Sequence, residues 1–174
     1  MRRESLKGLE FRNFAEIPEF DEKLTEFLNG LDEELKTWRD YVEKNGKRGI
    51  PHGITGYACL DCEKIVGISY FHVPKKLRIR YFINLLLARA SPKEAAIGSV
   101  VKTEYQRRGI FGHLFDLRNE LMRETGYGRV RYVTDFNNIA MLKWGEKKKH
   151  RIVKKTDKEI YFVYNLADDE RARG

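Results

Sequence analysis

Apolar and polar positions along the chain predict alternating strands and helices. Residues 9–14 alternate with period two, which predicts a first strand that ends before Pro18. A helical stretch follows, because apolar residues recur there every three or four positions, and Asn29-Gly30 divides it into two helices. The apolar residues that would share its buried face are Leu24, Leu28, Leu31, Leu35, Trp38 and Val42.

The middle of the chain predicts a hairpin, a helix and a buried strand. Residues 55–60 and 64–73 are β-rich runs around Asp61-Cys62-Glu63, and Pro74 ends the second run. Residues 76–90 start with a strand-like alternation and end in helix-forming leucines, and we predict a helix there. After Ser91-Pro92, residues 95–101 predict a buried strand.

The remaining pattern predicts two more helices, a strand and a hairpin. The first of these helices carries apolar residues at i, i+4, i+7 and i+11, namely Ile110, Leu114, Leu117 and Leu121. The elements are a helix from about Gly109 to a cap at Gly126, a strand at 129–135, a helix capped by Asp135 or Asn137 that runs to about Lys148, and a hairpin of 151–156 and 159–166.

This order of elements predicts one α/β domain at 1–166, followed by a polar, frayed tail at 167–174. The chain has 174 residues, the size of a single domain, and no linker-like composition shift or internal repeat divides it. A chain of this length can bury about 70% of the surface that its unfolded form exposes.

Composition indicates a folded chain with an anionic partner. Hydrophobic residues make up 41% of the chain, which excludes disorder, and 34 Lys and Arg face 26 Asp and Glu, giving a net charge of +8. This excess fits a partner that carries phosphates, either nucleic acid or a phosphorylated cofactor. Gln106 is the only glutamine among many Lys, Arg and Glu residues, a pattern of heat-adapted (thermophile) proteins.

The sequence shows neither a membrane span nor a secretion signal. No stretch reaches the roughly 18 uninterrupted apolar residues of a spanning helix. Met1–Leu6 contains basic residues, and no apolar segment follows them. We therefore expect a cytoplasmic protein without a membrane partner.

The two cysteines form Cys59-x-x-Cys62, a spacing found in redox and metal sites. A redox pair lies at a helix N-terminus, whereas this pair lies between two predicted strands. A zinc site needs two further ligands, and His52 and His72 are the only nearby histidines. We interpret the cysteines as ordinary residues near strand ends and predict no metal.

The segment from Lys102 to Gly112 carries the clearest chemistry. It joins a predicted strand to an amphipathic helix and contains small and basic residues. The N–H groups that open a helix lack carbonyl partners, and the helix dipole adds positive potential, so this segment suits an anion such as pyrophosphate. Arg107 and Arg108 would add charge. Neither a nucleoside-triphosphate loop nor a dinucleotide Gly-x-Gly-x-x-Gly is present.

This segment resembles the signature of the GNAT N-acetyltransferases. In that family a β-branched residue is followed after four residues by Gln or Arg, after two more by Gly, and after one more by Gly or Ala. Val101, Gln106 and Gly109 match this spacing, whereas the last position is Phe111 and Gly112 comes one step late.

A second motif and the order of elements extend the resemblance over nearly the full chain. Asn137-x-x-Ala140-x-x-x-Trp144 is similar to the family's Asn-x-x-Ala-x-x-x-Tyr. The resemblance implies a single-domain GNAT-like fold. Its central sheet would be mixed and mostly antiparallel, splayed at a cofactor cleft, with helices on both faces.

The resemblance also implies acyl-CoA, most simply acetyl-CoA, as co-substrate. Its pyrophosphate would bind the backbone of Arg107–Gly112, and its pantetheine arm would lie between the strands before and after the loop. Asn137 would reach the pantetheine or phosphate region. The implied cofactor residues are Val100, Val101, Gln106, Arg107, Arg108, Gly109, Ile110, Phe111, Gly112, Asn137, Ala140 and Trp144.

Acetyl transfer to an amine needs an oriented thioester, a neutral amine and a proton for the leaving thiolate. In the family a backbone N–H near Val100 or Val101 would meet the oxyanion. Trp144 occupies the position of the family's acidic Tyr, and an indole N–H is too weak an acid for that role. Tyr132 is a candidate acid and Glu94 a candidate base. Otherwise Tyr132 belongs to the core and Glu94 is an exposed residue at a strand end.

Three functions follow as hypotheses. The first is an acyl-CoA-dependent N-acyltransferase that transfers acetyl to a small-molecule or protein amine. The second is a catalytically silent acyl-CoA-binding module, motivated by Trp144. The third is a basic nucleic-acid-binding module, which the lack of an aromatic-basic RNA signature disfavours. The sequence leaves the acceptor, the acyl length and homo-oligomer formation open.

Overall fold

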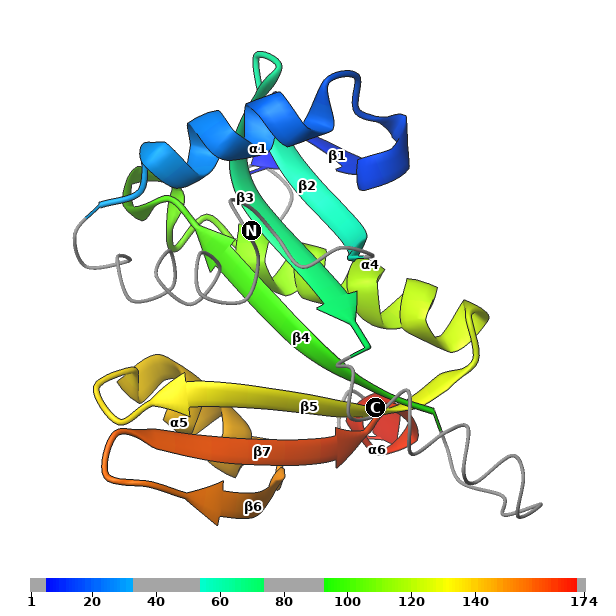
Figure 1. Ribbon diagram of the computed structural model, residues 1–174, viewed down its shortest axis with the longest axis vertical. Coiled ribbons are helices and arrows are strands. Elements are labelled where there is room, and N and C mark those ends of the chain that lie inside the picture. The colour runs from blue at the N-terminus through cyan, green and yellow to red at the C-terminus, as the bar shows by residue number, and fades with distance from the viewer. Residues whose placement is uncertain (1–5, 33–53, 74–92, 172–174) are drawn as a thin grey trace. The chain divides into compact units, whose positions relative to one another are not determined.

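A computed structural model describes residues 6–32, 54–73 and 93–171 (Figure 1). Its elements are β1 (Glu10–Asn13), η2 (Phe14–Glu16), α1 (Phe20–Asn29), β2 (Thr55–Asp61), β3 (Lys64–His72), β4 (Lys93–Val101), η4 (Thr103–Tyr105), α4 (Ile110–Glu124), β5 (Tyr127–Asp135), α5 (Ile139–Lys147), β6 (Arg151–Lys155), β7 (Glu159–Asn165) and α6 (Leu166–Arg171). The predicted second helix after Gly30 and the predicted helix at 76–90 lie outside these residues.

The strands form one mixed sheet in the order β1-β2-β3-β4-β5-β7-β6. The neighbours β1/β2, β2/β3, β5/β7 and β6/β7 run antiparallel, and β4 runs parallel to β5. The β4/β5 register covers Lys93–Ala96, so that Ile97–Val101 lie beyond its last registered pair. The predicted α/β class with a mixed, mostly antiparallel sheet is confirmed.

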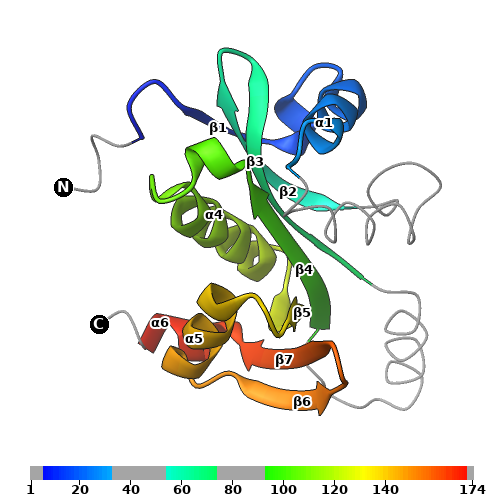
Figure 2. The ribbon, with the colours of Figure 1, turned by 90° about the vertical axis from the view of Figure 1, so that its left-hand side faces the viewer.

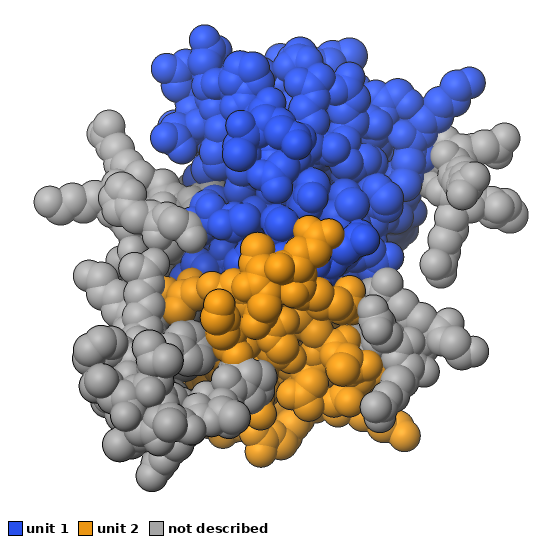
Figure 3. Space-filling model, turned by 90° about the vertical axis from the view of Figure 1, so that its right-hand side faces the viewer, with its two compact units in different colours: residues 1–72, 98–121 blue, residues 73–97, 122–174 orange. Residues whose placement is uncertain are grey.

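The chain divides into two compact units, coloured in Figure 3. Unit 1 contains Met1–His72 and Gly98–Leu121, and unit 2 contains Val73–Ile97 and Met122–Gly174. The boundary at residue 166 between a domain and a tail stays a prediction, although α6 gives helical structure to residues that the sequence predicted as frayed.

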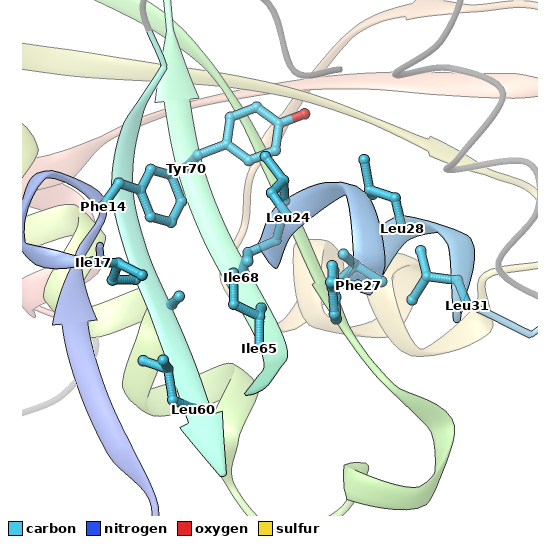
Figure 4. Packing of buried hydrophobic residues seen from close by; sticks show 12 residues of the cluster. Phe14, Ile17, Leu24, Phe27, Leu28, Leu31, Leu60, Ile65, Ile68 and Tyr70 are labelled. Carbon is cyan, nitrogen blue, oxygen red and sulfur yellow. The ribbon is translucent and has the colours of Figure 1, made fainter. Parts of the chain in front are cut away.

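In unit 1, α1 and α4 cover opposite sides of β2 and β3 (Figure 2). The alternation of side chains along a strand produces this arrangement. Ala58, Leu60 and Ile68 pack in the α1 cluster with Leu24 and Phe27 (Figure 4). Burying each large apolar side chain contributes about 1.5–3 kcal/mol to stability. The predicted stripe is confirmed at its described members Leu24, Leu28 and Leu31.

The opposite cluster of unit 1 lies between the sheet and α4. Cys59, Val66 and Val101 pack there with Ile110 and Leu114. The predicted hairpin is confirmed, and its two-residue turn places Cys62 at φ 47° and Glu63 at φ 68°. Two positive φ values at the centre of a two-residue loop define the type I′ turn, whose twist matches that of the strands.

Predicted helix ends are confirmed at three glycines. Gly30 ends α1 at its C-cap, and its amide donates to the Glu26 carbonyl at 3.0 Å. Gly109 precedes α4 with φ 85°, and Gly126 follows α4 with φ 81°. Glycine adopts this left-handed region without the clash that a Cβ causes. No described helix is long and apolar enough to cross a membrane.

Unit 2 contains the registered β4/β5 pairs and the β7/β6 hairpin. Val130, Tyr132 and Thr134 of β5 are buried, and Arg129, Arg131 and Val133 on the other face are half-buried. α6 contacts β5 and β7. The predicted final hairpin is confirmed at Arg151–Lys155 and Glu159–Asn165.

Candidate functional site

The loop between β4 and α4 is a compact turn with two left-handed residues. The Tyr105 amide donates to the Lys102 carbonyl at 2.9 Å, and the Gln106 amide donates to the Thr103 carbonyl at 3.1 Å. Arg107 has φ 63° and Gly109 has φ 85°. A non-glycine residue is strained at such a φ, which points to a conformation that the surrounding loop enforces at Arg107.

The first turn of α4 presents amides that precede the helical hydrogen-bond ladder. The His113 amide donates to the Gly109 carbonyl at 3.1 Å, which is the first i to i−4 bond. The amides of Ile110, Phe111 and Gly112 come before it and have no helical carbonyl four residues back. The helix dipole adds positive potential at this end. The arrangement can therefore bind an anion, as the sequence predicts.

The basic side chains of the loop lie in different surroundings. Arg107 is exposed, whereas Arg108 is half-buried, with its guanidinium carbon 5.4 Å from the centre of the Tyr105 ring. Gln106 is exposed, and its Nε2 donates to the Val101 carbonyl at 3.4 Å. The sequence predicts the same role for Arg107 and Arg108, that of adding positive charge to an anion site. In the structure the two side chains have different environments.

The apolar residues of the predicted site contribute backbone rather than side chains. Val100, Val101 and Ile110 are buried, with exposed fractions of 5%, 8% and 1%. Phe111 packs against the α4 cluster, and its ring lies 6.2 Å from that of Phe115. Its bulky side chain is thus accommodated in packing and its amide is retained. An added Cβ at Gly112 would have no neighbour within 4 Å in the part of the chain that the structure describes.

Arg118 of α4 forms a buried polar cluster with residues of β3 and β4, which the sequence did not predict. Arg118 of α4 is 0% exposed. Its Nη1 donates to the hydroxyls of Ser69 at 3.0 Å and Ser99 at 3.1 Å, and its Nη2 donates to Asn119 Oδ1 at 2.9 Å. Ser99 belongs to β4, so the guanidinium ties this strand to β3. Apolar periodicity alone carries no signal for such a cluster.

In unit 2, the cap of α5 is Asn138, which corrects the sequence prediction of Asp135 or Asn137. The Met141 amide donates to Asn138 Oδ1 at 3.1 Å. Asp135 instead accepts the Asn137 amide at 2.7 Å, which forms a turn before the helix. The Asn137 and Ala140 side chains are exposed. The capping role is therefore taken by the neighbouring asparagine.

Tyr132 and Trp144 belong to an aromatic cluster in unit 2. Tyr132 is 4% exposed, and its hydroxyl lies 3.0 Å from His150 Nδ1. Its ring stacks on Phe162 at 4.9 Å, and Trp144 meets His150 edge-on at 4.6 Å. Burial raises the pKa of the Tyr132 phenol. The sequence did not identify His150 as its partner.

Glu94 is buried in unit 2 and forms an ion pair. Its side chain is 6% exposed, and Arg131 Nε donates to its Oε1 at 2.7 Å. The interpretation of Glu94 as an exposed strand-end residue is therefore wrong. Its main-chain register pairs it with Arg129 on the adjacent parallel strand, and the long Arg131 side chain reaches the carboxylate.

The two cysteines lie in different environments and are not bonded to each other. Cys59 is 0% exposed on β2, and burial raises the pKa of its thiol to about 12. Cys62 is exposed in the hairpin turn. Among residues 6–32, 54–73 and 93–171, no group of three His, Cys, Asp or Glu side chains could hold a metal ion.

Thiol labelling checks this difference. The thiolate is the reactive form, and at pH 8 the raised pKa keeps Cys59 protonated. We expect a disulfide reagent such as DTNB to titrate one thiol per folded chain, Cys62, and two after denaturation. Loss of the fast phase in Cys62→Ser is the control. Two fast thiols in the folded chain would contradict the burial of Cys59.

Comparison with known proteins gives similarity in structure only. No protein-family profile and no curated protein sequence matches the chain. The GNAT domain of S. lividans PAT superposes with a TM-score of 0.63 at 13% identity, covering 90% of each chain. Arabidopsis thaliana NAA60 in complex with acetyl-CoA gives 0.58 at 17% identity, covering 91% of this chain and 99% of that chain.

A third solved structure agrees with these two. The ribosomal-protein-S18-alanine N-acetyltransferase from Escherichia coli gives a TM-score of 0.58 at 12% identity, covering 91% of this chain and 94% of that one. The similarity spans nearly the whole chain in each case. This chain therefore has the fold of the GNAT N-acetyltransferases.

Proposed function

We propose that this chain is an acyl-CoA-dependent N-acyltransferase that transfers acetyl from acetyl-CoA to an amine. The observation that carries the proposal is the turn at Gly109, which leads into the amides of Ile110–Gly112 before the helical ladder of α4 begins. Within a GNAT fold, such amides suit the diphosphate of coenzyme A. The acetyl-CoA in the NAA60 structure supports this choice of cofactor.

The predicted cofactor residues take different roles in this proposal. The diphosphate accepts hydrogen bonds from the backbone between Arg107 and Gly112, and exposed Arg107 adds a cation. Pantetheine and the thioester oxygen meet the backbone of β4 near Val100 and Val101, beyond the registered β4/β5 pairs. The exposed side chain of Asn137 is a further cofactor contact, and Ala140 and Trp144 follow it in the chain on α5.

The proposed chemistry relies on orientation and proton relay. A neutral amine attacks the thioester carbonyl, the amide forms, and coenzyme A leaves as a thiolate that takes a proton. The phenol of Tyr132 is buried with a raised pKa, so it is a poor donor to a thiolate, and one carboxylate oxygen of Glu94 is engaged by Arg131. We propose that water carries the protons, since holding the reactants together itself supplies much of the rate. Tyr132 and Glu94 stay predictions as proton carriers.

Turnover tests the proposed function. The chain is incubated with acetyl-CoA and a panel of amines, and release of free coenzyme A is followed with a thiol reagent in the Cys62→Ser variant. The panel includes peptides that begin with alanine, because one structural neighbour is named for that acceptor. Acceptor-dependent release supports the transferase. Binding of acetyl-CoA without release on any acceptor supports the silent binding module that Trp144 suggests.

The neighbours Asn137 and Asn138 give a matched pair of variants. Asn138→Ala removes the helix cap and is expected to lower stability by about 1 kcal/mol while leaving the affinity for coenzyme A unchanged. Asn137→Ala is expected to leave the melting temperature unchanged and to weaken coenzyme A binding by about five-fold, the value of one hydrogen bond. Thermal melting and calorimetry on both variants check the pair. A stability loss in Asn137→Ala alone would show that Asn137 caps the helix and would contradict the assignment of the cap to Asn138.

A further inference from the structure

A hydrogen bond joins the candidate anion-binding loop to the distant β2/β3 hairpin. Tyr105 of η4 donates its hydroxyl to Asp61 Oδ2 at 2.7 Å. Asp61 is the last residue of β2, 44 positions earlier in the chain, and both residues belong to unit 1. The ring of Tyr105 also makes a cation–π contact with Arg108, whose guanidinium carbon lies 5.4 Å from the ring centre. Tyr105 therefore contacts both an acidic and a basic residue.

The hairpin is braced at its tip. Glu63 in its turn accepts from Lys23 of α1 at 3.1 Å and from Arg12 of β1 at 3.3 Å. Each exposed ion pair contributes little to stability by itself, but Lys23 and Arg12 belong to different elements and donate to the same carboxylate. Asp61 pairs with Lys64 across the same turn. The carboxylate of Asp61 thus extends from a fixed part of the sheet.

The loop itself contains strain that such an anchor can offset. Arg107 occupies the left-handed region at φ 63°, at a cost of order 1–3 kcal/mol, which persists only where the surroundings enforce it. Arg107 lies two residues after Tyr105 and directly before Arg108. The contacts of Tyr105 and Arg108 therefore hold the chain on both sides of the strained turn.

We propose that Asp61, Tyr105 and Arg108 form a latch that holds loop 102–109 in its anion-binding conformation and leaves Arg107 as the cation that meets the ligand. This inference rests on the proposed function. It makes Asp61 and Tyr105 positioning residues, since neither touches the cofactor in the proposal. It also gives the two neighbouring arginines different tasks, one structural and one electrostatic.

A double-mutant cycle tests the latch. Tyr105→Phe removes the donor hydroxyl and Asp61→Ala removes the acceptor carboxylate, so that each variant lacks the hydrogen bond, and each is expected to weaken coenzyme A binding by about five-fold. The double variant is expected to bind no more weakly than the weaker single variant, because both changes remove one interaction. Tyr161→Phe is the matched control, since it removes a similar bond of 2.8 Å to Glu159 in unit 2.

Salt dependence separates positioning from charge. Arg107→Gln removes a cation, so its affinity is expected to fall and to depend less on ionic strength than that of the unmodified chain. Tyr105→Phe removes no charge and is expected to keep the original salt dependence. A reduced salt dependence in Tyr105→Phe, or additive losses in the cycle, would overturn the latch.

Hydrogen exchange tests the latch without any ligand. The amides of Tyr105 and Gln106 are hydrogen-bonded within the loop and are expected to exchange faster in Tyr105→Phe than in the unmodified chain and Tyr161→Phe. Equal exchange and equal affinity in Tyr105→Phe would overturn the proposal. If the unmodified chain bound no coenzyme A, the proposed function would fail, and the exchange rates alone would decide whether the latch orders the loop.

Discussion

Gly109→Val is expected to weaken coenzyme A binding at least 100-fold, which corresponds to about 2.7 kcal/mol. Gly109 has φ 85°, a region that a β-branched residue adopts only under strain. Among the described residues, space is available around the glycine, because an added Cβ would have none of their atoms within 4 Å. A valine there would extend into the open space beside the proposed diphosphate site. The expected loss of binding thus combines a displaced turn with a blocked approach.

Gly126→Val is the matched control for this variant. Gly126 lies at the other end of α4 with φ 81°, and an added Cβ would lie 3.8 Å from Lys93 Nζ, an ordinary contact distance. Both variants are expected to lose stability to a similar degree through backbone strain, and only Gly109→Val is expected to lose binding. Calorimetry and thermal melting measure both quantities. Equal binding losses in the two variants would show that affinity merely follows stability.

Among the described glycines of unit 1, Gly56 is expected to be the one at which substitution by alanine destabilises most. An added Cβ would overlap the Ser69 carbonyl oxygen and lie 2.7 Å from Tyr70 Cα. These atoms belong to the β3 backbone, which pairs with Gly56 at Tyr70, so the methyl can be accommodated only by separating the strands. We expect a loss of about 3 kcal/mol, at the upper end of overpacking effects.

Gly112→Ala makes the same chemical change in the opposite structural setting. Gly112 lies in the first turn of α4, and no atom of residues 6–32, 54–73 or 93–171 would lie within 4 Å of an added Cβ. Alanine favours the helix over glycine, so a gain of about 0.5 kcal/mol is expected. Urea unfolding of the ligand-free variants compares them with the unmodified chain. A Gly56→Ala variant as stable as the parent would contradict the described β2/β3 pairing.

Local signals explain why much of the fold was predictable. Strand alternation and turn residues predicted the β2/β3 hairpin and the β6/β7 hairpin, in which consecutive strands pair across a short turn. Gly109 and Gly126 marked helix ends because glycine adopts the left-handed backbone conformation there without a Cβ clash, and Gly30 marked the end of α1. The candidate loop was predictable for the same reason, since its chemistry comes from the backbone.

Contacts between distant segments were not predictable. The bond from Tyr105 to Asp61 spans 44 residues, and the bonds of Arg118 to Ser69 and Ser99 span 49 and 19 residues. The stripe on α4 predicted Leu117 as a core residue, yet Leu117 is half-buried and its neighbour Arg118 is fully buried. Periodicity locates the buried face of a helix to within about one residue, and it cannot identify a buried charge that finds polar partners on other elements.

The sequence alone also could not identify which residue caps α5. Asp135, Asn137 and Asn138 are all residue types that accept hydrogen bonds from backbone amides. The structure assigns the helix cap to Asn138 and the preceding turn to Asp135, which leaves the Asn137 side chain exposed. That assignment depends on where β5 ends, which composition does not specify. It strengthens the proposal that Asn137 contacts the cofactor.

Titration calorimetry of the purified chain with acetyl-CoA and with coenzyme A measures binding at the proposed diphosphate site. The backbone amides after Gly109 are proposed to bind the diphosphate, so saturable heat is expected for both ligands, with one site per chain, and this heat is expected to be lost in Gly109→Val. Absence of heat at millimolar ligand, with the chain shown to be folded by its thermal transition, would overturn the proposed cofactor site.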